Sequence, residues 1–239
     1  MRLDKYLADS GLGSRREVKT LIKKGRISVN DVLVRSDKQQ VDANHDVVKF
    51  DGNLVQHQTL FYYVMNKPAG FVSVTKDNLH KTVLQLLSDE DYREDIFPAG
   101  RLDKDTEGLL LLTNDGGLAH DILAPNRHVE KEYFAEIDGI VTEETVKKFA
   151  DGVELFDEKG IFTGELKILE TDNLTETSKI SLIIHRGVYH QVKRMFIGQN
   201  MKVTYLKRTR MGNLELPSDL TKGNYRPLTE NELSNLRNI

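Results

Sequence analysis

The chain has 239 residues, of which 38% are hydrophobic and 30% charged, and it contains no cysteine. This composition indicates a folded protein of one or two domains, and it excludes disulfides, iron–sulfur clusters and thiolate metal sites. Because it shows neither a membrane-spanning apolar run nor the apolar core of a signal peptide, we expect a cytoplasmic protein without membrane association.

The formal net charge of -3 hides two basic segments. Residues 1–30 hold eight Lys and Arg against three acidic residues, and residues 185–210 hold seven against none. Basic stretches on an otherwise acidic chain are typical of a protein that binds a polyanion at defined places. Two solvated faces of a helix or strand are the alternative interpretation.

The first elements form a small helical and β unit. Apolar residues recur at helical spacing in residues 3–9, and a second helix is expected to begin at Ser14, with Glu17 completing a capping box. Apolar residues then flank Asn30 and Asp31, a pair that favours a tight hairpin turn. We expect a two-helix unit followed by a hairpin.

This stretch, RLDKYLADSGLGSRREVKTLIKKGRISVNDVLV, resembles the S4 RNA-binding domain. The resemblance implies RNA binding but no chemistry; a generic basic helical hairpin is the alternative. The RNA contacts it implies are Arg15, Arg16, Lys19, Lys23, Lys24 and Arg26. The texture of the sequence changes after a polar segment, so we predict one domain over residues 1–58 and a second over residues 59–239.

The second part alternates strands and helices. Strands are expected in LFYYVMNKP, GLLLLTND, VEKEYFAEIDG, IFTGELKILE, SKISLIIHRG and KVTYLKRTRMG, and helices in TEETVKKFADG, YHQVKRMFIGQN and LTENELSNL. Thr82 and Gln85 predict a capped short helix between the first two strands. Strands that outnumber the helices and interleave with them indicate an α+β fold, with a mixed, mainly antiparallel sheet.

The segment PAGRLDKDTEGLLLLTNDG places charged groups directly before a buried strand. Charged groups there cost desolvation unless they are paired or used, so this loop is a candidate site. Asp103, Asp105 and Glu107 imitate the first positions of a calcium loop, but Asn114 stands where that loop needs a bidentate glutamate. No metal is therefore expected. A polar turn with paired acids remains the interpretation that spacing alone favours.

The same segment resembles the signature of the RsuA/RluA-type pseudouridine synthases, in which the aspartate of G-R-L-D is catalytic. EKEYFAEI and HRGVYHQVKRMF resemble two further motifs of that family. The resemblance implies that Asp103 is the catalytic carboxylate, that Tyr133 lies in the active site, and that Lys193 pairs with Asp103. Many members have arginine at the last position, and lysine cannot form the same bidentate pair.

The family reaction rearranges one nucleotide, so no cofactor is expected. Asp103 could act as a nucleophile or as a base, and the sequence leaves both open. Tyr133 could stack on uracil, and Arg101 could fill the gap that a flipped base leaves or hold a flanking phosphate. We expect the backbone phosphates to be held by Arg186, Arg194, Lys207, Arg208 and Arg210. His185 and His190 lack a third ligand for zinc, and His190 is expected to be a hydrogen-bonding helix residue.

The branch of the family that the chain most resembles modifies small-subunit ribosomal RNA. We therefore expect a uridine of 16S ribosomal RNA as the substrate, with a 23S uridine as the alternative. A non-catalytic ribosomal RNA-binding assembly factor is the second alternative. The partner implied is the small-subunit precursor or assembling particle. A monomer is expected, since no coiled-coil heptad is present.

Overall fold

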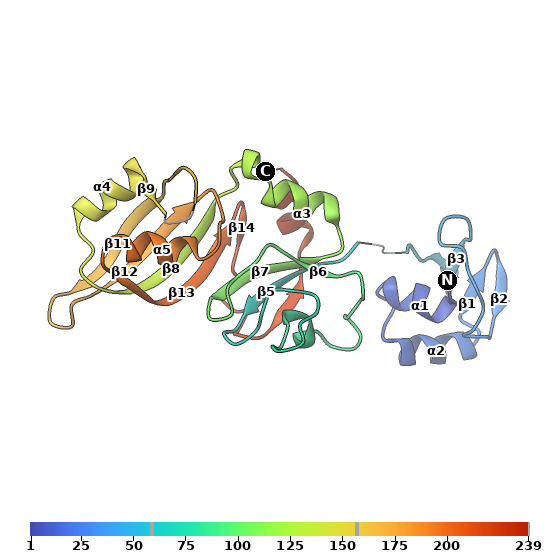
Figure 1. Ribbon diagram of the computed structural model, residues 1–239. Coiled ribbons are helices and arrows are strands. Elements are labelled where there is room, and N and C mark those ends of the chain that lie inside the picture. The colour runs from blue at the N-terminus through green and yellow to red at the C-terminus, as the bar shows by residue number, and fades with distance from the viewer. Residues whose placement is uncertain (58–59, 156–157, 239) are drawn as a thin grey trace. The chain divides into compact units, whose positions relative to one another are not determined.

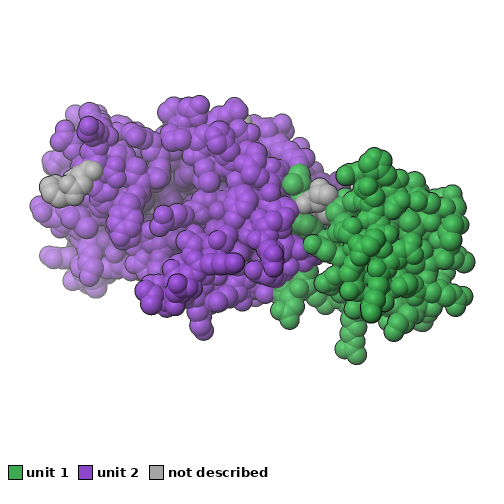
Figure 2. Space-filling view, turned by 45° about the vertical axis from the view of Figure 1, so that its right-hand side comes forward, with its two compact units in different colours: residues 1–61, 88–91 green, residues 62–87, 92–239 purple. Residues whose placement is uncertain are grey.

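The computed structural model describes residues 1–57, 60–155 and 158–238. Contacts divide the chain into two compact units, residues 1–61 with 88–91 and residues 62–87 with 92–239 (Figure 2). The domain boundary predicted at residue 58 falls on residues 58–59, which lie outside the described residues. Among the described helices, none has both the length and the apolar character needed to cross a bilayer.

The first unit packs two helices on a four-stranded antiparallel sheet (Figure 1). Its elements are α1 (Leu3–Asp9), α2 (Arg15–Lys23), β1 (Ile27–Val29), β2 (Val32–Val34), β3 (Val48–Phe50) and β4 (Asn53–Leu54). The predicted capping box is confirmed, because Ser14 and Glu17 exchange bonds at the start of α2. The predicted hairpin is confirmed too: Asn30 and Asp31 have φ of 50° and 64°, which a tight two-residue turn requires.

The second unit is built on a nine-stranded sheet with the main order β11-β12-β8-β13-β7-β5-β15. Its strands are β5 (Tyr62–Lys67), β6 (Phe97–Ala99), β7 (Glu107–Thr113), β8 (Lys131–Asp138), β11 (Glu165–Asp172), β12 (Thr177–Ile184), β13 (Lys202–Met211), β14 (Leu214–Glu215) and β15 (Tyr225–Pro227). All described pairs in this sheet are antiparallel except β13 with β7. The predicted α+β class with a mainly antiparallel sheet is confirmed.

Helices cover this sheet at both ends. Helix α5 (Gln191–Ile197) packs on β13 and α4 (Glu143–Asp151) on β11, whereas α3 (Gly116–Leu123) packs on β6 and α6 (Glu230–Arg237) on β14 (Figure 1). The remaining elements are the 3-10 helices η1 (Val83–Leu86) and η2 (Pro125–Arg127) and the short strand pair β9 (Val153–Glu154) and β10 (Ile161–Phe162). Every residue of β7 is buried, as its continuous apolar sequence predicts.

The predicted cap at Thr82 is wrong. The segment is a single 3-10 turn, in which the N–H of Gln85 donates to the carbonyl of Thr82. The Thr82 side chain makes no cap bond. Four residues in 3-10 geometry satisfy their backbone locally, so the turn needs no side-chain cap.

The parallel contact between β13 and β7 depends on Gly108. Lys207 pairs with Glu107 and Arg208 with Gly108, and these are the two residue pairs of this contact. Gly108 has φ of 97°, and a Cβ there would lie 2.2 Å from the carbonyl oxygen of Arg208. Only glycine allows this approach. The short contact brings the loop before β7 beside β13.

The terminal helix makes stability depend on pH through Glu232. Arg226 first, and then Thr229, hydrogen-bond its carboxylate and lower its pKa from 4.5 to about 2. A folded pKa below the unfolded value stabilises the protein above pH 4.5, and this contribution is lost as the pH falls toward 2. Glu232→Gln is expected to lower the free energy of unfolding at pH 7 by about 1–2 kcal/mol.

Thermal unfolding of both proteins between pH 7 and pH 2.5 measures this difference, which should shrink as the pH falls. Glu230→Gln, on the exposed side of the same helix, is the matched control. A difference that stays constant with pH would contradict the role of Glu232.

Candidate active site

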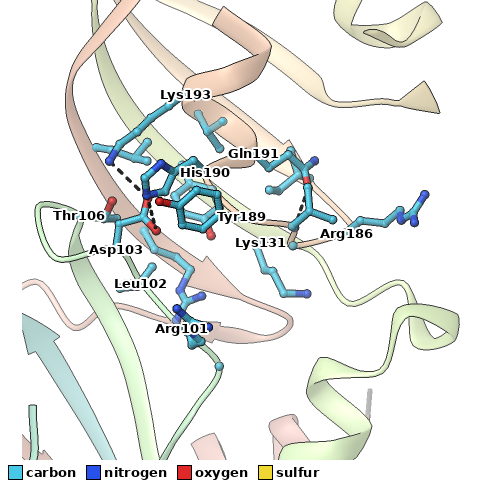
Figure 3. Close-up of a pocket in the computed structure, with 18 of the residues that line it drawn as sticks. Arg101, Leu102, Asp103, Thr106, Lys131, Arg186, Tyr189, His190, Gln191 and Lys193 are labelled. Carbon is cyan, nitrogen blue, oxygen red and sulfur yellow. Dashed lines mark hydrogen bonds and ion pairs between the residues drawn. The ribbon is translucent and has the colours of Figure 1, made fainter. Parts of the chain in front are cut away.

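A pocket of about 560 Å³ opens in the second unit where β13 meets β7. Its wall comes from the loop before β7, from β8, from the segment between β12 and α5, and from β13. Asp103, Tyr133, Lys193 and Arg101, expected from the sequence to belong to one site, all line it. Figure 3 shows the side chains of Lys193 and His190 pointing toward the side chain of Asp103.

The ammonium of Lys67 fixes the loop that carries Asp103 through hydrogen bonds to its backbone carbonyls. This lysine ends β5 and is completely buried. Its Nζ donates to the carbonyl oxygens of Thr106 at 2.7 Å and Asp103 at 3.0 Å, with longer contacts to Pro68 and Lys104. Ser73 adds a reciprocal pair of hydrogen bonds with the backbone of Leu102. The backbone around Asp103 is therefore fixed on both sides.

Burial lowers the pKa of Lys67 to about 8, although Asp105, Asp103 and Glu107 act in the opposite direction. This residue was not predicted from the sequence. Its signal was a lysine at the end of the apolar strand segment FYYVMNK, where a buried cation needs partners. Those partners are backbone carbonyls, which a sequence pattern does not reveal.

Asp103 lies between two basic side chains from the start of α5. Lys193 Nζ is 3.3 Å from Asp103 Oδ2, and His190 Nε2 is 3.5 Å from Asp103 Oδ1. The side chain of Asp103 keeps 27% of its surface exposed, so it is held in place but accessible from the pocket. Lys193 is thus beside Asp103, as the family resemblance implies.

Lys193 is shared with a second carboxylate. Its Nζ donates to Asp105 Oδ1 at 2.6 Å, which is shorter than its distance to Asp103. Partial burial acts to lower the pKa of Lys193, but Asp105 and Asp103 outweigh it and hold this pKa above the ordinary lysine value. Lys193 therefore stays charged at neutral pH and offers its charge to both acids.

His190 was expected to be a hydrogen-bonding residue within a helix, but it immediately precedes α5. It occupies the N-cap position with φ of 51°, makes no side-chain cap bond there, and stacks on Tyr189 at 3.8 Å between ring centroids. This left-handed backbone turns the imidazole toward Asp103. His185 also lines the pocket, and its Nδ1 lies 3.0 Å from the carbonyl oxygen of His128. Over the described parts of the chain, no group of three or more potential ligands could hold a metal ion.

Tyr133 lies in the wall of the pocket and is 8% exposed. It belongs to the buried face of β8, together with Lys131, Ala135 and Ile137. Its strand neighbours are Leu182 on β12 and Arg208 on β13. The alternation of β8 thus predicts the burial of Tyr133, and the strand order brings it to the same pocket as Asp103.

Two of the expected RNA contacts are exposed residues that line this pocket. Arg101 precedes Asp103 by two residues, and Arg186 follows β12 with its guanidinium 5.0 Å from the centre of the Phe162 ring. Arg194 instead donates hydrogen bonds from Nη1 to the carbonyl of Tyr189 and to the carboxylate of Glu158. Lys207 is half-buried.

Arg208 and Arg210 require a correction. Arg208 is 2% exposed, and its Nε donates to the carbonyl of Leu109 at 2.8 Å, so it cannot grip a phosphate on the molecular surface. Arg210 pairs with Glu130 at 2.8 Å and Glu132 at 3.1 Å. The register between β13 and β8 shifts between these two arginines, so Arg208 is buried while Arg210 stays partly exposed and paired with acids.

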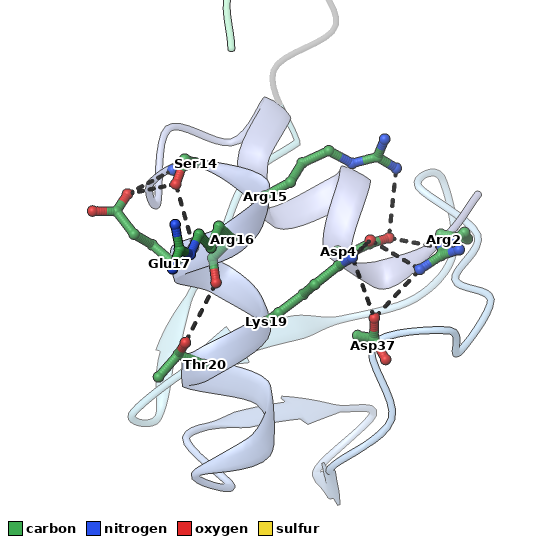
Figure 4. A network of polar contacts seen from close by, with 9 residues as sticks. All are labelled: Arg2, Asp4, Ser14, Arg15, Arg16, Glu17, Lys19, Thr20 and Asp37. Carbon is green, nitrogen blue, oxygen red and sulfur yellow. Dashed lines mark hydrogen bonds and ion pairs between the residues drawn. The ribbon is translucent and has the colours of Figure 1, made fainter. Parts of the chain in front are cut away.

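The first unit carries its own basic surface. Asp4, whose side chain is only 1% exposed, draws Arg2, Arg15 and Lys19 together, and Asp37 joins this network (Figure 4). Of the other expected RNA contacts in this unit, Arg16, Lys23 and Lys24 are exposed to solvent. Arg26 pairs with Asp51 and lies over the Phe50 ring at 4.5 Å.

Comparison with known proteins gives two family matches. A model described as RNA pseudouridylate synthase matches residues 61–197, and a model of the S4 domain matches residues 1–47. A solved structure titled as a crystal structure of pseudouridylate synthase is similar over 99% of both chains, with 34% identity and a TM-score of 0.69.

Curated relatives match over nearly the whole chain. The uncharacterized RNA pseudouridine synthase YtzG of Bacillus subtilis is 43% identical over 98% of this chain and 97% of its own. The ribosomal small subunit pseudouridine synthase A of Escherichia coli is 40% identical over 99% of this chain and 100% of its own.

The Lys67 ammonium generates a prediction about the loop. Lys67→Met removes the donor from buried carbonyls, so the free energy of unfolding should fall by about 3 kcal/mol. Thr106 N–H bonds Asp103, and Gly70 N–H bonds Lys104, so both amides should exchange with solvent faster. Hydrogen exchange and denaturant unfolding measure these effects. Exposed Lys104→Met is the control, and unchanged exchange at Thr106 in the Lys67 variant would refute the role of the ammonium.

Proposed function

The chain belongs to the RNA pseudouridylate synthase family, and from this premise we propose that the uridine it isomerises lies in small-subunit ribosomal RNA and that Asp103 is the catalytic carboxylate. One observation carries the assignment of Asp103: its carboxylate is accessible in a pocket between Lys193 and His190, with Tyr133 in the wall. The similarity to the Escherichia coli small-subunit enzyme over almost the full length supports the choice of RNA.

Lys193 and His190 define what Asp103 can do. Lys193 Nζ, 3.3 Å from Asp103 Oδ2, holds the carboxylate in one position at the pocket. As a nucleophile, Asp103 would bond to C1′ while the N1–C1′ pair leaves with uracil. As a base, it would take the C2′ proton while the same bond breaks. Both roles need the carboxylate within reach of the ribose, and the fixed backbone of the loop provides this.

Tyr133 and the basic residues complete the proposal. The Tyr133 ring offers a surface on which uracil can stack, and its hydroxyl is a candidate for accepting the C5 proton late in the reaction. Arg101 would fill the gap left by the flipped nucleotide, and Arg186 would hold a neighbouring phosphate. The first unit, which contains the S4 domain, would add affinity for RNA through Arg16, Lys23 and Lys24.

The reaction redistributes bonds within one nucleotide, so the proposal includes no cofactor. The protein is proposed to work on ribosomal RNA in the cytoplasm as a monomer. A non-catalytic assembly factor would not need an accessible carboxylate such as Asp103 between the side chains of Lys193 and His190. A large-subunit uridine remains the competing substrate.

Asp103→Asn is expected to abolish pseudouridine formation, with a loss of more than about 10³-fold, because the amide can neither attack C1′ nor accept the C2′ proton. RNA affinity should stay within about twofold, since exposed cations supply most of it. Single-turnover assays on precursor small-subunit RNA and binding titrations measure both. Asp105→Asn, which removes the other partner of Lys193, should cost less than about tenfold. An active Asp103→Asn variant would refute the assignment.

The substrate is tested by mapping pseudouridines in ribosomal RNA from cells with and without this protein. We expect one small-subunit position to lose its modification, and the purified protein to restore it on the unmodified RNA. A position lost from large-subunit RNA instead would overturn the small-subunit proposal. Tight binding without product on any ribosomal RNA would favour the assembly factor.

A further inference from the structure

Two cations in the pocket wall have no acidic partner among the residues that the structure describes. Arg208 is 2% exposed and Lys131 7% exposed, and both line the pocket that holds Asp103. Lys131 Nζ donates to the carbonyl of Val129 at 2.8 Å, and Arg208 Nη2 is buried without a hydrogen-bond partner. Across the described residues, neither cation forms a salt bridge. Lysine and arginine are almost never so buried unless they are paired.

This arrangement costs stability. Lys131 shares the buried face of β8 with Tyr133, and Tyr133 pairs in register with Arg208 on β13. Burial first, and repulsion from Arg208 second, lower the pKa of Lys131 to about 8. A methionine at position 131 would avoid the desolvation cost of the charge. A protein that keeps two uncompensated charges in its pocket is expected to use them on a ligand.

Resting on the proposed function, we propose that Lys131 and Arg208 are catalytic residues that bind the exocyclic carbonyl oxygens of the flipped uracil and stabilise its negative charge after the N1–C1′ bond breaks. Both cations are nearly shut off from solvent, so the part of the nucleotide that enters deepest meets them, and that part is the base. Phosphates remain on the exposed backbone, where Arg101 and Arg186 are available.

The chemistry requires such a site by either route. When the N1–C1′ bond breaks, its electron pair leaves with N1 and spreads over the ring onto O2 and O4. Asp103 meanwhile bonds to C1′ or takes the C2′ proton, so the uracil ring becomes an anion in both cases. C5 then bonds to C1′, the carboxylate leaves C1′ or returns its proton to C2′, C5 loses its proton, and N1 gains one. Lys131 and Arg208 would hold the ring anion while it turns.

Donors aimed at a charge that develops in a desolvated site typically contribute about 10²–10³-fold in rate. Lys131→Met should therefore lower single-turnover consumption of the target uridine by about 100-fold at saturating RNA. A 5-fluorouridine at the target makes the ring anion intrinsically more stable, so the same variant should lose less than about tenfold on that RNA. Both reactions are followed as disappearance of the target nucleoside, because fluorine blocks the last step. Lys131→Arg, which keeps the charge, should recover most of the rate.

The controls separate this site from a structural role. Lys167→Met, at an exposed position of β11, should leave the rate unchanged. Because removing an uncompensated buried charge relieves desolvation, Lys131→Met should unfold at the same or a higher temperature than the wild type. A lower unfolding temperature would contradict the premise that the charge is uncompensated. Arg208→Met provides the second variant and should show the same dependence on fluorine.

Equal losses on uridine and 5-fluorouridine, together with weaker RNA binding, would identify a phosphate subsite and overturn the proposal. Unchanged rates in both Lys131→Met and Arg208→Met would overturn it as well. Failure of the proposed function is a different result: the wild type would make no pseudouridine, or Asp103→Asn would remain active. The two ideas can thus fail separately.

Discussion

The site depends on one buried ammonium. Lys67 ends a buried strand and gathers the carbonyls of Asp103, Lys104 and Thr106, so the loop before β7 has a fixed backbone although its side chains are charged. The carbonyls of Asp103 and Lys104 also accept hydrogen bonds from the N–H groups of Thr106 and Gly70, so the ammonium adds a shared donor to a loop that is already hydrogen-bonded. Because Lys67 bonds only the backbone of Asp103, the carboxylate stays free to face the pocket, where Lys193 and His190 approach it.

Charge around the pocket is arranged by depth. Arg101 and Arg186 are exposed residues suited to phosphates, Lys193 and His190 flank the carboxylate, and Lys131 and Arg208 are buried. Among the described residues, neither member of the buried pair has a carboxylate partner, although each lies where exposure to water is small. The order matches what a flipped nucleotide presents from outside inward: backbone, ribose, then base. The exposed cations of the pocket can therefore be assigned to RNA binding, and the buried cations to the chemistry on the base.

Much of this could be predicted from the sequence, for physical reasons that differ by residue. The box of Ser14 and Glu17 is a local interaction, and the alternation that buries Tyr133 has a period of two, so both are readable along the chain. The roles implied for Asp103 and Lys193 came from resemblance, not spacing. Lys67, His190 and the burial of Arg208 could not be predicted, because they depend on carbonyls, a left-handed cap and a strand neighbour that the fold alone brings together.

The most direct measurement is a crystal structure of the protein with an RNA that carries 5-fluorouridine at the target position. We predict that this nucleotide is turned out of its helix into the pocket, with the ribose beside the Asp103 carboxylate and the base on Tyr133. Its carbonyl oxygens should lie about 3 Å from Lys131 and Arg208. A target nucleotide bound away from Asp103, or left stacked in the RNA, would contradict this account of the active site.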